Sequence, residues 1–218
     1  MRKNGKEARR LYAGLPIVRE ARTWAEIDLD ALEYNYRQIR ARLRPQTRLC
    51  CVIKANAYGH GAPEIARLYE QLNMDFLAVS NIEEALQLRH ANIQLPILIL
   101  GYTPAPCVEL LAEHALTQCV YSREYADLLS ECAQRAGVEL DVHVKLDTGM
   151  GRIGLRYRGD GQDAKTLDDI EQICALPGLQ AKGIFTHFAS ADEGEDGEEF
   201  SRNQHTRFYE AVKRLEGR

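Results

Sequence analysis

The sequence lacks a long hydrophobic run. None of its 218 residues belongs to an apolar stretch of the roughly 18 residues that a transmembrane helix needs. The first 22 residues carry seven lysines and arginines but no apolar segment of a secretory signal. The formal net charge of -4 gives no general reason to expect nucleic acid as a partner. We therefore expect a cytoplasmic protein with no membrane or nucleic-acid partner and a basic leader over residues 1–22.

Cysteine pairs of the C-x-x-C type are also absent, which argues against zinc ribbons and thioredoxin-like sites. The six scattered cysteines are typical of free thiols packed as small hydrophobes in a reducing cytosol. His187, Asp192 and Glu195 could form a metal site, but the acidic loop that holds them is more simply solvated. The sequence thus predicts no metal.

Short apolar runs alternate with helical patterns from Leu49 onward. The runs cover residues 49–53, 76–79, 96–100, 119–121, 138–146 and 181–185. This alternation predicts βαβ units and a parallel sheet. No G-x-G-x-x-G turn follows the first run, so the dinucleotide-binding form of a doubly wound sheet is disfavoured.

Polar residues at the predicted strand ends favour a barrel instead. Lys54 and His187 follow two of the apolar runs, and Lys145 lies near the end of a third. In a (β/α)8 barrel these ends meet at one mouth. Strand alternation directs His143 and Lys145 into the interior. We expect a TIM-type barrel over residues 23–218, truncated after about six of its eight strands.

The segment from Val52 to Gly61 offers the most specific chemistry. A buried ammonium is costly and tends to lose its proton, and a neutral Lys54 amine could form a Schiff base. Tyr58 and two glycines follow, where backbone can approach an anion closely.

Two further motifs add charge and an aromatic ring. The loop from Lys145 to Gly154 contains three glycines and presents Arg152, whose fork suits a carboxylate or a phenolate. Lys145 and Arg152 would repel each other unless an anionic ligand, Asp147 or modification of Lys145 intervened. His187, in the motif from Phe185 to Asp192, could lie flat against an aromatic ligand.

These three motifs, with the segment 23–28, resemble the barrel domain of bacterial alanine racemases over about residues 23–207. The resemblance implies an isomerase that interconverts L-alanine and D-alanine through a pyridoxal 5'-phosphate Schiff base. It also implies a homodimer and a role in supplying D-alanine for the peptidoglycan of the cell wall.

The resemblance assigns a role to five residues. Lys54 would carry the cofactor and act as the catalytic base on the D-side α-proton. Tyr58 would bind the cofactor phosphate, and His187 would lie against the pyridine ring. Arg152 would contact both the cofactor's phenolic oxygen and the substrate carboxylate. Lys145 matches a lysine that is often carbamylated in the family.

Other parts of the family pattern have no matching position. These are two strands, an arginine facing the pyridine nitrogen, and the C-terminal β domain that gives the partner subunit a second, tyrosine base. We therefore expect a fragment or truncated gene product with little activity alone. The alternatives are a serine/alanine racemase domain of a glycopeptide-resistance protein, a decarboxylase on the same barrel, or a non-catalytic pyridoxal-phosphate-binding fragment.

Overall fold

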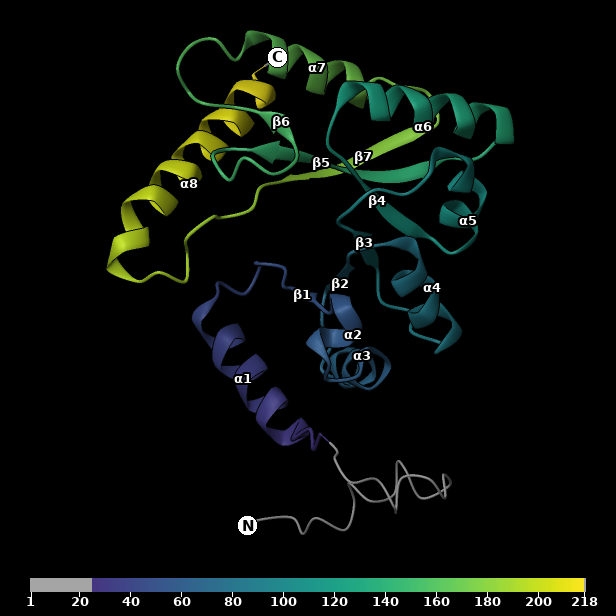
Figure 1. Ribbon diagram of the computed structural model, residues 1–218, viewed down its shortest axis with the longest axis vertical. Helices are drawn as coiled ribbons and strands as arrows, with labels where there is room; N and C mark the ends of the chain where they lie inside the picture. Colours follow the sequence, from purple (N-terminus) through teal and green to yellow (C-terminus); the bar gives the residue numbers. More distant parts are fainter. Residues whose placement is uncertain (1–24, 218) are drawn as a thin grey trace.

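One parallel sheet organises the molecule (Figure 1). The computed structural model describes residues 25–217, so the predicted leader lies outside the described part. The strands are β1 (Cys50–Val52), β2 (Phe76–Val79), β3 (Ile97–Ile99), β4 (Leu116–Val120), β5 (Leu140–Asp147), β6 (Leu155–Arg156) and β7 (Leu179–Phe185).

Helices follow most of the strands. They are α1 (Leu29–Arg42), α2 (Lys54–Tyr58), α3 (Ala62–Gln71), α4 (Ile82–His90), α5 (Val108–Glu113), α6 (Arg123–Ala136), α7 (Ala164–Cys174) and α8 (Glu195–Glu216), with a 3-10 turn, η3, at Ala105–Cys107. Figure 1 shows α4, α5 and α6 along one side of the sheet, with α1 near β1 and α8 near β6.

The strand order identifies the architecture. The strands lie in the order β1-β2-β3-β4-β5, and β7 pairs with β5, so each long strand lies beside the one before it. A doubly wound sheet reverses its order at a switch point, whereas a (β/α)8 barrel keeps the order of the chain. The sheet is the sequential parallel arrangement of a TIM-type barrel, and the predicted fold class is confirmed.

The alternation of side chains on β5 separates the core from the site. Val142, Val144 and Leu146 are at most 1% exposed and belong to the hydrophobic core shared with the helices. His143 and Lys145 occupy the other face. This is the parity that the sequence predicts.

Several element ends differ from the sequence prediction by one to three residues, and two differences from the predicted elements have a clear cause. β4 begins at Leu116, whereas the apolar pattern predicts a start at residue 119. The prediction is late because the polar Thr117 and Gln118 interrupt the pattern. The Ser-x-x-Glu spacing at Ser80 predicts a capping box, but Asn81 caps α4 and accepts the Glu84 N–H at 2.9 Å. Both differences leave the strand order unchanged.

The sheet is open at two strands. Within residues 25–217, β1 pairs only with β2, and β7 pairs only with β5. Val52 is 39% exposed, although it ends a strand. The interior face near β1 therefore remains accessible.

Candidate active site

Lys54 begins α2, two residues after β1 ends. The helix that it opens is unusual, because Ala55, Asn56, Ala57 and Tyr58 all have φ between 52° and 55°. Left-handed helical backbone costs about 1–2 kcal/mol per L-residue. Such strain concentrates at functional sites, where the surrounding structure must hold it in place.

Glu84 on α4 holds this left-handed turn. One carboxylate oxygen accepts the Ala55 N–H at 2.7 Å. The other accepts both the N–H and the hydroxyl of Ser80 at 2.8 Å. Because Ser80 directly follows β2, the carboxylate joins the carboxyl ends of two adjacent strands beside Lys54.

Lys145 is buried in β5, with only 4% of its surface exposed. Its amine donates to the Leu146 carbonyl at 3.1 Å and lies 5.3 Å from the centre of the Phe185 ring. Burial lowers the pKa of Lys145, and nearby Arg152 lowers it further, against the opposing effect of Cys119 and Asp147. Lys145 therefore gives up its proton more readily than a surface lysine.

Asp147 organises the glycine loop rather than forming an ion pair with Lys145. Its Oδ1 accepts the N–H groups of Gly149 and Gly151 at 2.9 and 3.0 Å, and its Oδ2 lies 3.9 Å from Arg158. Burial alone would raise the pKa of Asp147, but these hydrogen bonds and nearby cations hold it below the ordinary value. Its negative charge therefore serves mainly to hold the backbone of the loop.

Gly154 explains why this loop needs glycine. Its φ is +127°, and a Cβ there would lie 2.9 Å from the Asp147 nitrogen and 3.0 Å from the Lys145 carbonyl oxygen. The loop folds back onto β5 at this contact and forms β6. Arg152 is consequently presented, exposed, on a loop anchored to the strand that carries Lys145.

His187 connects the three motifs electrostatically. It lies two residues beyond β7 and lines an open pocket of about 510 Å³ with Thr186, Phe188, Ala191 and Asp192. Partial burial lowers the pKa of His187, and Arg152, Lys145 and Lys54 each lower it further. The structure thus brings these four predicted residues together at one edge of the sheet.

Tyr58 lies at the end of α2, the element that Lys54 begins. Its side chain is 61% exposed, and within residues 25–217 its hydroxyl makes no hydrogen bond. His60 supports the turn because its Nδ1 lies 2.9 Å from the Ala57 carbonyl oxygen.

A polar network behind His187 was not predicted from the sequence. The Thr148 and Thr186 hydroxyls are 2.9 Å apart, and Arg207 donates to the Thr148 carbonyl at 2.9 Å. Gln204 is fully buried and donates hydrogen bonds to the Thr148 hydroxyl and to the His187 carbonyl. The sequence offers one indication of this network: Gln204 lies four positions before Phe208, on the face of the last helix that packs inward.

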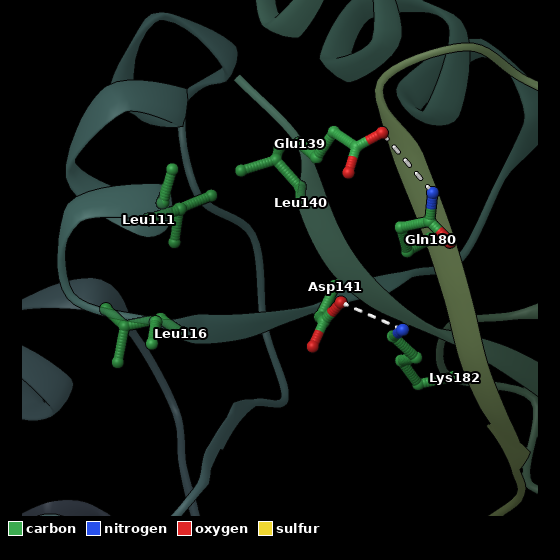
Figure 2. A pocket seen from close by; sticks show the side chains of 9 residues that line it. Leu111, Leu116, Glu139, Leu140, Asp141, Gln180 and Lys182 are labelled. Atoms are coloured by element: carbon green, nitrogen blue, oxygen red, sulfur yellow. Dashed lines mark hydrogen bonds and ion pairs between the residues drawn. The ribbon is translucent and has the colours of Figure 1, made fainter.

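Figure 2 shows a second pocket, of about 470 Å³, at the amino ends of β5 and β7. Its polar residues face one another: Gln180 donates to Glu139 at 3.5 Å, and Lys182 forms an ion pair with Asp141 at 3.7 Å. Because Lys54 and His187 lie past the carboxyl ends of their strands, this pocket does not belong to the candidate site.

Among residues 25–217, no group of three His, Cys, Asp or Glu side chains could hold a metal ion, and this includes the acidic loop with Asp192 and Glu195. In the same part of the chain, no helix has the length and hydrophobicity to cross a membrane.

Comparison with known proteins gives consistent matches. A family model for the N-terminal domain of alanine racemase matches residues 27–218. An alanine racemase of Desulfovibrio desulfuricans is 41% identical over 193 residues, which cover 88% of this chain and 50% of that protein. One of Clostridium perfringens is 45% identical over 170 residues, covering 78% and 42%.

Solved structures give the same result. The alanine racemase of Clostridium difficile 630 in complex with cycloserine aligns with a TM-score of 0.83 at 39% identity, covering 91% of this chain and 52% of that one. The chain therefore spans about half the length of the relatives that it matches.

Proposed function

The chain belongs to the alanine racemase family through its N-terminal domain, and on that premise we propose that it provides the cofactor-binding site of an enzyme that interconverts L-alanine and D-alanine. The cofactor would be pyridoxal 5'-phosphate, and the complete enzyme would be a cytoplasmic homodimer that supplies D-alanine for the cell wall.

The observation that carries this proposal is the convergence of cations around His187. The positive charges of Lys54, Lys145 and Arg152 all lower the pKa of its imidazole. The nearby Asp147 carboxylate is instead occupied by hydrogen bonds from backbone N–H groups of the loop. A site with this excess of positive charge suits a ligand with several negative charges. The phosphate and phenolate of pyridoxal phosphate, together with a substrate carboxylate, satisfy that requirement, so the residues fit the cofactor.

Each residue would contribute a separate step. Bound pyridoxal phosphate supplies an electron sink that makes the α-proton of an amino acid acidic. The Lys54 amine would hold the cofactor covalently and, once freed by the substrate, take the α-proton from one face. Arg152 would hold the substrate carboxylate with its planar fork. Tyr58, whose hydroxyl is exposed, would hydrogen-bond the phosphate.

His187 would pack against the cofactor ring as a neutral imidazole. Burial and the three cations hold its pKa below the ordinary histidine value, which favours the neutral form of the ring. A neutral ring stacks on the cofactor without adding charge beside the pyridine nitrogen. Carbamylation would change Lys145 from a cation that repels Arg152 into an anion that attracts it.

Racemisation needs a base on each face of the substrate, and Lys54 supplies one of them. We assign no second base among residues 25–217. One base alone still exchanges the α-proton with solvent, which gives a test that does not depend on the second base. In deuterium oxide with pyridoxal phosphate, we expect the chain to incorporate deuterium at the α-carbon of D-alanine.

Two variants make this test specific. Lys54→Ala should reduce exchange to the rate of free cofactor, whereas Lys165→Ala, which removes a lysine 84% exposed on α7, should leave it unchanged. Exchange that persists in Lys54→Ala would refute the role of Lys54. Cofactor binding without exchange of any amino acid would favour the alternative of a non-catalytic binding protein.

A further inference from the structure

Gln204 makes three hydrogen bonds from a fully buried position on α8. Its Nε2 donates to the His187 carbonyl at 3.0 Å and to the Thr148 hydroxyl at 3.4 Å. Its Oε1 accepts the Ala189 N–H at 2.9 Å. An amide carries a donor and an acceptor at one end, so Gln204 can bind backbone groups on both sides of Phe188.

These hydrogen bonds hold a backbone segment that lies beyond the end of β7. β7 ends at Phe185, so the backbone at His187 has no sheet partner to orient it. In the described part of the chain, the His187 carbonyl and the Ala189 N–H both bond to Gln204. The third bond reaches Thr148, which begins the loop that presents Arg152.

We propose that Gln204 is a positioning residue of the candidate site, which fixes His187 relative to the Arg152 loop so that both can engage one planar, anionic cofactor. This inference rests on the proposed function. Gln204 touches no reacting atom in this account and acts through His187 and Thr148. The cofactor would then bind against a His187 side chain whose backbone is already held by Gln204 of α8.

The test measures His187 directly. In Gln204→Met, which keeps an unbranched side chain of similar length, NMR titration of the six histidines should show the pKa of His187 rising toward its ordinary value. The reason is that a mobile His187 is less buried and lies farther from Arg152, Lys145 and Lys54. The pKa of His143, lowered mainly by burial in β5, should stay low and so report an intact fold.

Matched variants and the cofactor complete the experiment. Asn203→Met, an amide replacement on the exposed side of α8, should leave the pKa of His187 unchanged. Pyridoxal phosphate, followed by absorbance, should bind Gln204→Met roughly tenfold more weakly than the parent chain.

Three results would overturn the proposal. The first is an unchanged His187 pKa in a folded Gln204→Met variant. The second is loss of folding in both Gln204→Met and the milder Gln204→Asn, because Gln204 would then serve only the packing of α8. The third is a parent-like cofactor affinity in Gln204→Met. If the parent chain binds no pyridoxal phosphate, the proposed function fails, while the NMR titration still decides the effect of Gln204 on His187.

Discussion

Lys145 shows at the scale of one residue how burial and charge prepare a group for chemistry. The residue is 4% exposed, its amine donates to the Leu146 carbonyl and to no carboxylate within residues 25–217, and a second cation, Arg152, lies nearby. Replacing the positive charge with a negative one would remove this conflict. Carbamylation by carbon dioxide does so, because it needs a neutral amine and produces an anion.

We predict that Lys145 forms a carbamate. Because its pKa is lowered by burial, the neutral amine appears at lower pH than on surface lysines. At a fixed concentration of dissolved 13C-labelled carbon dioxide, a carbamate NMR signal should therefore grow as the pH rises through the pKa of Lys145. The signal should be absent in Lys145→Met and present in Lys165→Met. An equal signal in both variants would exclude Lys145 as the site.

At the scale of one element, α2 shows strain and its compensation side by side. Four successive L-residues are left-handed, and the Glu84 carboxylate accepts three hydrogen bonds next to them. The turn directs the chain away from the sheet immediately after Lys54. The strained backbone is thus tied to the same carboxylate that fixes the ends of β1 and β2.

Glu84→Gln should destabilise the chain by about 1–3 kcal/mol, because one carboxylate oxygen becomes an NH2 group, which cannot accept the backbone N–H of either Ala55 or Ser80. Urea unfolding gives the free energy. The control is Glu83→Gln, an exposed neighbour on the same helix, which should change stability by less than about 0.5 kcal/mol. Equal stability of the two variants would show that the Glu84 bonds do not support the turn.

The sequence predicts elements well where pattern determines them. The six predicted strands and the inward parity of His143 and Lys145 are present, and α6 begins after Ser122 and ends before Gly137, as these residue types favour. β6 was missed because a two-residue strand has no pattern. The left-handed turn was missed because Ala55 and Ala57 carry no preference for positive φ. Gln204 was missed because its bonds reach 15 and 56 positions along the chain.

At the scale of the whole molecule, the sequential parallel sheet is what creates the site. Lys54, Lys145 and His187 are separated by 91 and 42 positions in the sequence, yet they meet because parallel strands end on the same edge. The described sheet leaves β1 and β7 with free edges. These edges leave the interior near Val52 open, where that residue is 39% exposed.

We propose that this edge of the sheet holds pyridoxal phosphate on Lys54. The most direct measurement is reduction of the chain with borohydride in the presence of pyridoxal phosphate, followed by peptide mass spectrometry. We predict one dominant label, on the peptide that contains Lys54. Labelling spread over exposed lysines such as Lys165, with no excess on Lys54, would contradict the account.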